Sequence, residues 1–502
     1  MRTFIKEIVT GEYVNAIGWI TSIEKDGFTL TDFTGDIYVN YYNISDIGYR
    51  DVVSVTGKCI LNMNSKYIVE DACVRIINKS VIDKKYMKSF LLYNLSKERI
   101  EILRRENFMR NIVRNYLLGY DFIETSVPLL WKTVKEYGSL EWGIHNPITG
   151  KECYKLLQSP NIINLIMSIS GIERSFQFAK CFRIPEENNF KRTDALVEFH
   201  QLAITSTFLS NEEGMKLIEG LMAELVYKLY GEKIVLPFPR YDFSKMNLLY
   251  CSDKHDMRLK DYFAPDIKKI KDCNMIMYMF PYDDIETYLS RYLEYYKKKC
   301  GIENLIYTIG RFEKIEEKLS NLLNLKEELQ KIINCNYEKY TYLLLKYDEK
   351  FGKEMCNQFF IMLSNFIEKI KNQNIERFNF YWVEKYPYIK DHEKGTNGLG
   401  QNLFTKKKGD ESYAFDLILN GFEIASGGEK NCDTEEFIQN IDKLELNRNE
   451  YDYFIQILKS GAPQLFSVGI GWERIVWKLL NTQNIQDIML IHYDQSGDND
   501  IW

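Results

Sequence analysis

The chain has 502 residues, 45% of them hydrophobic, which allows two or three domains with hydrophobic cores. A net charge of −6 excludes an overall basic surface for nucleic acid, although local patches can still bind it. Its ten cysteines form no CxxC pair, so we expect a reducing cytoplasm without zinc or disulfides, and no apolar run predicts a membrane segment or a signal core.

The N-terminal 80 residues predict a small β-barrel. Between residues 12 and 78, short stretches alternate in hydrophobicity, and turn signals lie at 25–27 and 34–35. This pattern suits the five-stranded OB fold.

Residues 96–118 predict an amphipathic helix. Its apolar positions recur at helical spacing, and Ser96 is a suitable N-cap. The expected core positions are Ile100, Leu103, Phe108, Ile112 and Leu117. The chain then runs from this helix into a predicted strand that ends at Pro128, and a second helix is expected over 211–229.

The stretch 176–199 predicts a hairpin that could hold a nucleotide. A strand reading FQFAKCFR is followed by a polar loop and then by a second strand that begins VEF. Arg183 could fork onto a phosphate, and Phe199 offers a flat face to a purine ring. An ordinary hairpin with a charged tip is the alternative.

Two further segments carry chemistry. FDLILNGFE (415–423) places Asp416 and Glu423 on either side of a turn, where they could hold a hard cation or simply be exposed hairpin acids. SVGIGWERIVWKLL (467–480) is a glycine-bearing strand that runs into a helix, with Arg474 in its first turn.

In this order and spacing, three segments closely resemble class II aminoacyl-tRNA synthetases: LLQSP (156–160), the hairpin and SVGIGWER. That family has three signature motifs, and the segments that resemble them are 116–130, the hairpin and SVGIGWER. YCSDKHDMR (250–258), FDLILNGFE and NIQDIML (484–490) are similar to the bacterial aspartyl type. The resemblance implies an α+β fold. An OB-fold barrel (1–80) would precede a class II catalytic core (81–261 and 351–502), an antiparallel sheet flanked by helices, with an inserted α/β domain (262–350).

The resemblance also implies an ATP site. Arg183 and Arg474 would be the catalytic cations, at the α- and γ-phosphates of ATP, and Phe199 would stack on the adenine. Asp416 and Glu423 would bind Mg²⁺. Pro185 stands where the family has an acid that contacts adenine, so one of two nearby glutamates would replace it. The remaining ATP-binding residues would be Glu186, Glu187, Arg192 and Gly471.

The residues expected at the amino-acid pocket depart from the aspartyl pattern. Asn164 replaces a lysine, Ala203 replaces an acid, and Lys430 replaces an arginine that forks onto the aspartate side chain. Gln401 and Asn402 replace a pair of histidines. The full set expected there is Glu136, Ser159, Asn161, Asn164, Ala203, Gln401, Asn402 and Lys430. Arginine and lysine are not equivalent at a bidentate site, so we expect altered aspartate selection.

The anticodon-reading residues of the barrel are also mostly replaced. Only Lys25 is basic in the stretch where the family carries several arginines. Phe28 could still stack on a base, and Tyr38 stands in place of a glutamine.

These features predict a homodimeric ligase that uses ATP and Mg²⁺ to activate an amino acid and transfers it to the 3′ end of a tRNA. Two alternatives stay open: transfer to a peptide or small amine, and a non-catalytic regulator. The sequence leaves undetermined the amino acid, the acceptor and the role of the insertion.

Overall fold

The computed structural model describes most of the chain outside residues 259–375. The described residues are 2–62, 67–81, 97–131, 139–185, 195–250, 252–258, 275–280, 290–291, 293–294, 306–310, 341–346, 376–388, 403–443, 447–482 and 484–490. The chain divides into two compact units, one up to Arg105 and the other from Glu106 to Asp498.

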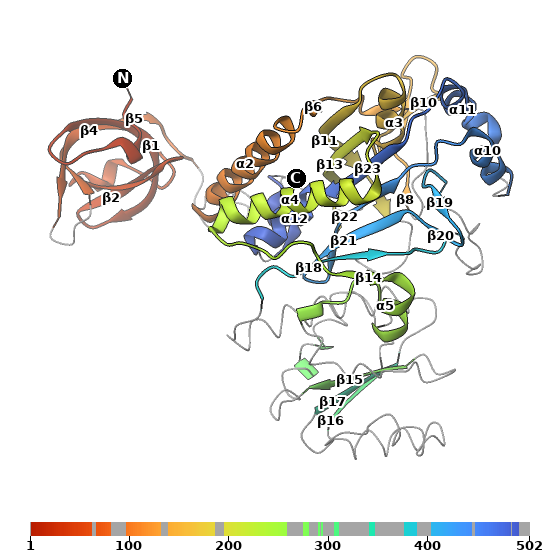
Figure 1. Ribbon diagram of the computed structural model, residues 1–502. Helices are drawn as coiled ribbons and strands as arrows, with labels where there is room; N and C mark the ends of the chain where they lie inside the picture. The colour runs from red at the N-terminus through yellow and green to blue at the C-terminus, as the bar shows by residue number, and fades with distance from the viewer. Residues whose placement is uncertain are drawn as a thin grey trace. The chain divides into compact units, whose positions relative to one another are not determined.

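The first unit contains a closed barrel in the strand order β1-β2-β3-β5-β4, which confirms the predicted five-stranded barrel (Figure 1). Its strands are β1 (Tyr13–Glu24), β2 (Gly27–Asp32), β3 (Gly35–Asn40), β4 (Val52–Leu61) and β5 (Tyr67–Asn78), with 3-10 turns η1 (Ile5–Glu7) and η2 (Ile44–Asp46). Strands β3 and β5 pair in parallel, and the other neighbouring strands pair antiparallel.

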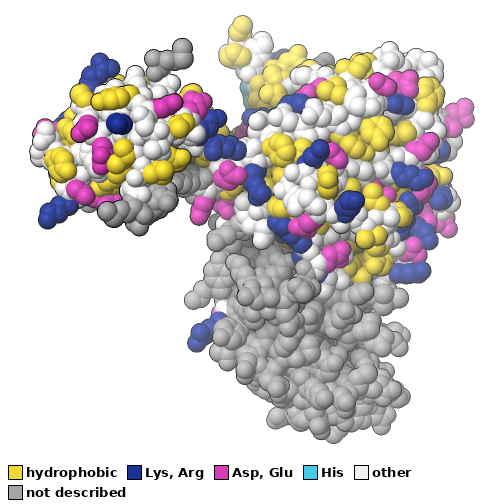
Figure 2. Space-filling view, turned by 60° about the vertical axis from the view of Figure 1, so that its left-hand side comes forward, with side chains coloured by type: hydrophobic (Ala, Val, Ile, Leu, Met, Phe, Trp, Pro, Cys, Tyr) yellow, Lys and Arg dark blue, Asp and Glu magenta, His cyan; other side chains and the backbone are white. Residues whose placement is uncertain are grey.

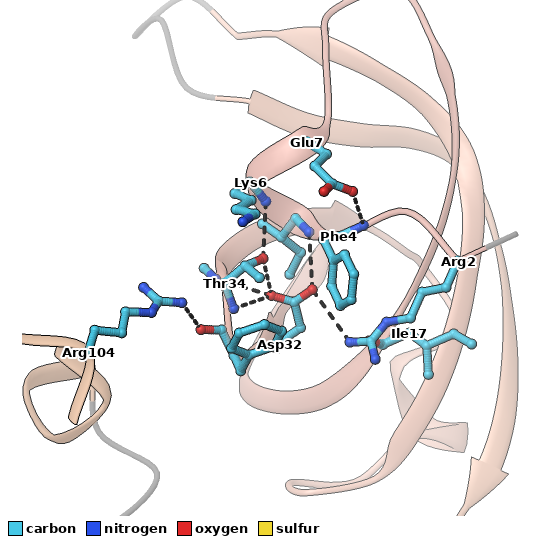
Figure 3. A network of polar contacts seen from close by, with 11 residues as sticks. Arg2, Phe4, Lys6, Glu7, Ile17, Asp32, Thr34 and Arg104 are labelled. Atoms are coloured by element: carbon cyan, nitrogen blue, oxygen red, sulfur yellow. Dashed lines mark hydrogen bonds and ion pairs between the residues drawn. The ribbon is translucent and has the colours of Figure 1, made fainter. Parts of the chain in front are cut away.

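A buried carboxylate stabilises the turn between β2 and β3 (Figure 3). Asp32 Oδ1 accepts hydrogen bonds from the backbone N–H and hydroxyl of Thr34 at 2.7 and 2.5 Å, and from the N–H of Gly35 at 3.1 Å. Asp32 Oδ2 accepts from the N–H of Ile5 at 3.1 Å. One side chain therefore closes the turn and ties η1 to the barrel.

The expectation that Phe28 could stack on a base is wrong. Phe28 is 0% exposed, because the alternation of β2 turns Phe28 and Leu30 into the barrel core. Tyr38 pairs with the outward-facing Thr29, and its hydroxyl donates to Asp26 Oδ1 at 2.9 Å. Its ring lies over Gly27, where a Cβ atom would be 3.0 Å from it. Tyr38, not Phe28, is therefore the aromatic residue on the outer face of these strands.

The second unit is built on a sheet that has eight strands in the described part of the chain, in the order β14-β18-β21-β22-β23-β13-β11-β6. The strands are β14 (Arg240–Asp242), β18 (Phe380–Glu384), β21 (Ala414–Leu419), β22 (Phe422–Glu429), β23 (Leu465–Gly471), β13 (Glu198–Thr207), β11 (Arg174–Phe182) and β6 (Ile123–Glu124). Only the outermost pairs, β14/β18 and β6/β11, are parallel. The antiparallel sheet with flanking helices confirms the predicted fold class.

Helices cover this sheet. Helices α4 and α12 lie along one face (Figure 1), with Phe466 of β23 against Gly214 of α4. The helices are α2 (Lys97–Leu118), α3 (Asn161–Ile169), α4 (Asn211–Tyr230), α5 (Phe243–Tyr250), α10 (Thr434–Lys443), α11 (Asp452–Lys459) and α12 (Trp472–Leu480), with η6 (Arg448–Glu450) and η7 (Ile485–Ile488). Helix α4 begins at a capping box formed by Ser210 and Glu213 and ends at left-handed Gly231, as local sequence rules require.

Short strands complete the described structure. They are β7 (Leu130–Trp131), β8 (Ser139–Leu140), β9 (Gly143–His145), β10 (Glu152–Leu156), β12 (Ile184–Pro185), β19 (Lys407–Lys408) and β20 (Glu411–Ser412). Within the predicted insertion, β15 (Met275–Phe280), β17 (Thr341–Lys346) and β16 (Ile306–Gly310) form an antiparallel sheet. Most of the insertion lies outside the described residues.

Two expectations around the first motif need correction. The predicted helix is present as α2, but Phe108 is 46% exposed and is not a core residue. The strand expected to run up to Pro128 comprises only Ile123 and Glu124.

Candidate active site

The predicted hairpin is present and supplies one side of the site. Strands β11 and β13 pair antiparallel, with Cys181 opposite Phe199 and Gln177 opposite Ala203. Residues paired in this way point to the same sheet face. The pairing continues from Ala203 to Gly469, Ser426 and Asp416 on the next three strands. One line of residues therefore crosses the sheet from the hairpin to a proposed metal-binding acid, on the face opposite α4 and α12.

Arg183 lies where the first strand of the hairpin ends. Its Nε donates to the carbonyl oxygen of Gln158 at 3.0 Å, and its backbone N–H donates to the carbonyl oxygen of Val197 at 2.8 Å. The centre of its guanidinium lies 5.3 Å from the centroid of the Phe199 ring. The two residues predicted to contact the nucleotide are therefore neighbours, and the cation–π contact holds them together.

Asp416 and Glu423 lie on one hairpin, whose turn is formed by Asn420 and Gly421 with φ values of 51° and 80°. Ile418 pairs with Glu423, and Asp416 pairs with Ser426, so the register shifts by one residue between the two pairs. This bulge lets Glu423 and Ser426, three residues apart, both share the face of Asp416.

The sequence reasoning missed three residues that surround these acids. The Nζ of Lys254 forms an ion pair with Glu423 Oε2. The hydroxyl of Tyr386 donates to Asp416 Oδ2 at 2.7 Å and lies 3.1 Å from Asp253 Oδ2. Asp253 and Lys254 belong to the segment YCSDKHDMR, so its resemblance to the aspartyl type was the available signal.

The charges in this cluster perturb one another. Burial and the nearby negative charge of Glu423 raise the pKa of Asp416 to about 7, although Lys254 and the hydrogen bond from Tyr386 oppose the shift. Burial lowers the pKa of Lys254, but the charges of Glu423, Asp253 and Asp416 outweigh it, and the net pKa is raised. Excess negative charge at a buried acid is what a bound cation would relieve.

Two carboxylates suit Mg²⁺, which is usually held by one or two acids and by substrate phosphates. In the part of the chain that the structure describes, no group of three or more His, Cys, Asp or Glu side chains could hold a metal by itself. The donor set at Asp416 and Glu423 therefore fits a magnesium ion that arrives with a polyphosphate.

Arg474 lies beside these acids. It stands in the first turn of α12, and its Nη1 donates to the carbonyl oxygen of Glu423 at 3.0 Å. Gly471 ends β23, directly before α12. Next to Arg474, the buried Glu473 contacts His200 of β13, a pair that the sequence reasoning also missed.

Two of the residues expected at the amino-acid pocket, Asn164 and Ala203, lie with Gln177 in a neutral group. Gln177 Nε2 donates to Asn164 Oδ1 at 2.5 Å, and both side chains are 2% exposed. Ala203, opposite Gln177, is fully buried. Sequence reasoning did not single out Gln177, because its partner is on a helix 13 residues away.

The other residues of that set lie at two places. The Ser159 hydroxyl accepts from the N–H of Asn161 at 3.3 Å, at the start of α3. Lys430 follows β22, and its N–H donates to the carbonyl oxygen of Leu465 at 2.8 Å. The remaining predicted site residues lie outside the described ones: Glu136, Glu186, Glu187, Arg192, Gln401 and Asn402.

Across the described residues, no helix is both long and apolar enough to cross a membrane.

Known proteins are similar over nearly the whole chain. The family described as tRNA synthetases class II (D, K and N) matches residues 82–493. An aspartate–tRNA ligase of Thermosipho melanesiensis is 26% identical over 98% of this chain and 91% of its own length. An aspartate–tRNA ligase of Mycoplasma capricolum is 25% identical over 96% of this chain and 92% of its own length.

A solved structure is similar as well. The asparaginyl-tRNA synthetase of Pyrococcus horikoshii, complexed with asparaginyl-adenylate, superposes with a TM-score of 0.62 at 14% identity, covering 98% of this chain and 97% of the other. At that identity the likeness shows the fold.

Proposed function

The chain belongs to the class II tRNA synthetases of the D, K and N group, a family of ligases, and from this premise we propose that it joins an amino acid to AMP and then transfers it to a tRNA. The observation that carries the proposal is the single site face on which Phe199, Asp416 and Glu423 lie, with Arg183 and Arg474 beside it.

The chemical difficulty of the first step is charge. The carboxylate of the amino acid must attack the α-phosphate of ATP, a polyanion, and pyrophosphate must leave. Fixed cations and alignment lower that barrier. Arg183 would contact the α-phosphate and Arg474 the γ-phosphate, while Phe199 stacks on the adenine. Gly471 would lie under the nucleotide, since it has no side chain.

Magnesium would be held by Asp416 and Glu423 and would supply charge neutralisation at the phosphates. Lys254 would keep Glu423 oriented towards the ion. The pKa of Asp416 is raised first by burial and then by the charge of Glu423, and this supports the assignment, because a buried acid beside a second carboxylate gains most from a cation.

We propose further that the acyl specificity differs from that of the aspartate relatives. Asn164 and Gln177 are already hydrogen-bonded to each other, and both are neutral. Ala203, opposite Gln177 on the next strand, offers no charge. None of these three side chains offers a cation to a substrate carboxylate, and Lys430 carries a single point charge where the family has a forked arginine. Losing one charge-assisted hydrogen bond costs roughly 1.5–3 kcal/mol. An uncharged side chain fits this group better than aspartate does.

The barrel supports a second candidate, transfer to an acceptor other than tRNA. On its outer face, hydroxyls bond to one another: Thr21 to Thr31 at 2.7 Å and Ser22 to Thr29 at 2.8 Å. On the face of the barrel seen in Figure 2, basic side chains are scattered among acidic ones. Affinity for tRNA depends on clustered basic contacts, which favours weak anticodon reading.

We also propose a homodimer in the cytoplasm. Strand β6 is an edge of the large sheet, and exposed apolar side chains surround it in sequence: Phe108, Leu118, Tyr120, Ile123 and Leu129. Such side chains are suited to a protein interface. Reduced cysteines suit the cytoplasm, and in the described residues none of the cysteines at 59, 73, 153, 181 and 432 forms a disulfide.

Charging assays test the acceptor. We expect an aspartate tRNA with its native anticodon and the same tRNA with a scrambled anticodon to be charged equally. A large loss on scrambling would show that the barrel reads bases. Charging of neither, with activation of an amino acid intact, would favour the non-tRNA acceptor.

A further inference from the structure

The buried Glu473 and the partly exposed His200 form a contact between the two parts of the proposed ATP site. Glu473 Oε2 accepts a hydrogen bond from the backbone N–H of His200 at 2.8 Å, and Glu473 Oε1 lies 2.8 Å from Nδ1 of its imidazole. Glu473 is 3% exposed. Both oxygens of one buried carboxylate are therefore engaged by a single residue.

The contact lies at the end of the ladder between β13 and β23. Pairing between β13 and β23 ends at Gln201 and Gly471, because the chain then turns into α12. The backbone N–H of His200 is the next donor along β13, and a buried donor needs a partner. The carboxylate of Glu473 accepts that hydrogen bond and so fixes the first turn of α12 to β13.

The neighbours of this pair are the residues proposed to hold ATP. His200 follows Phe199, whose ring lies against Arg183, and Glu473 precedes Arg474, which donates to Glu423. Successive side chains on a strand point to opposite faces, so the His200 ring lies away from the face that carries Phe199. It therefore acts through its neighbours and does not touch the substrate.

We propose that Glu473 and His200 are positioning residues, which hold Phe199 and Arg474 at the separation that ATP requires. This inference rests on the proposed function. Geometry of this kind affects rate strongly, since a misplacement of about 1 Å can cost roughly 100-fold. A purely structural pair would instead affect stability and leave the affinity for ATP unchanged.

The test measures KM and kcat of ATP–pyrophosphate exchange for the full chain and its variants. Glu473→Gln keeps the size of the side chain but loses one acceptor, so we expect kcat to fall about tenfold and the KM for ATP to rise, with the KM for the amino acid unchanged. His200→Ala should match it. His200→Asn keeps a side-chain donor and should restore much of the loss.

The control is Glu212→Gln, which removes the charge from a bidentate contact with Arg240 at 2.7 and 2.8 Å. Arg240 lies on β14, five positions from β13 in the strand order of the sheet, so this variant should leave both the KM for ATP and kcat unchanged. Folded Glu473→Gln and His200→Ala proteins with wild-type constants for ATP would overturn the inference. If the wild type showed no pyrophosphate exchange with any of the amino acids, this result would contradict the proposed function and not the inference. ATP titration by calorimetry would then decide the inference, which requires weaker binding by Glu473→Gln and is contradicted by equal binding.

Discussion

Replacing Asp416 by Asn should make the metal-free protein more stable at neutral pH. Asp416 is 9% exposed, and burial and the charge of Glu423 raise its pKa to about 7 from an ordinary 3.8. Between these two values the folded protein binds a proton that the unfolded chain has lost. The free energy of unfolding therefore falls as pH rises from about 4 to about 7.

The size of the effect follows from the shift. Three pH units at about 1.4 kcal/mol each give roughly 4 kcal/mol as an upper limit. Asn cannot ionise, so the stability of the variant relative to wild type should rise by up to this amount between pH 4 and pH 7.5. Any packing change caused by the substitution has the same effect on stability at both pH values, so it cancels in the comparison between them.

The assay is urea unfolding with chelator present, followed by tryptophan fluorescence at several pH values. Asp256→Asn is the matched control. Asp256 is also buried, but Arg258 contacts it at 2.6 and 2.9 Å and outweighs the effect of burial, so its pKa is lowered. The free energy of unfolding of that variant should be roughly 3–5 kcal/mol lower than that of the wild type, and this difference should be nearly constant above pH 4. A stability difference for Asp416→Asn that does not change with pH would refute the reasoning. Adding Mg²⁺ with ATP should stabilise the wild type more than Asp416→Asn.

The other predictions concern activity. Arg183→Ala and Arg474→Ala should each lower pyrophosphate exchange by about 100- to 1,000-fold in a folded protein, because each removes a fixed cation from the developing charge, and near-normal exchange would contradict the proposed phosphate contacts. Asp416→Asn combined with Glu423→Gln should abolish the dependence of exchange on Mg²⁺ together with the activity, and full activity of this double variant would assign both acids to structure alone. Phe28→Ala should destabilise the barrel by roughly 3–5 kcal/mol without any specific effect on tRNA affinity, and a selective loss of tRNA binding by a folded variant would restore Phe28 as a base contact.

Local patterns predicted the elements of this fold well. The alternation in residues 12–78, the hairpin at 176–199 and the strand that runs into the helix at 467–480 are all present, and the family inferred from them is confirmed. These features depend on neighbours in sequence, which the sequence displays directly.

Local patterns could not show which face of a strand is buried, or which residues far apart in sequence contact each other. Phe28 was expected to be able to stack on a base, whereas the alternation along β2 turns it into the barrel core. Tyr386 and Asp416 are 30 residues apart, and His200 and Glu473 are 273 apart. Only the folded sheet brings such pairs together, so these contacts had no signal in spacing or composition.

The most direct test of the account is ATP–pyrophosphate exchange by the purified protein with Mg²⁺ and each of the twenty amino acids, with and without tRNA. We predict exchange that depends on one preferred amino acid other than aspartate. A clear preference for aspartate over the whole panel would contradict the altered pocket, and the absence of exchange with every amino acid, by a folded protein with or without tRNA, would contradict the central claim that this chain forms an aminoacyl-adenylate.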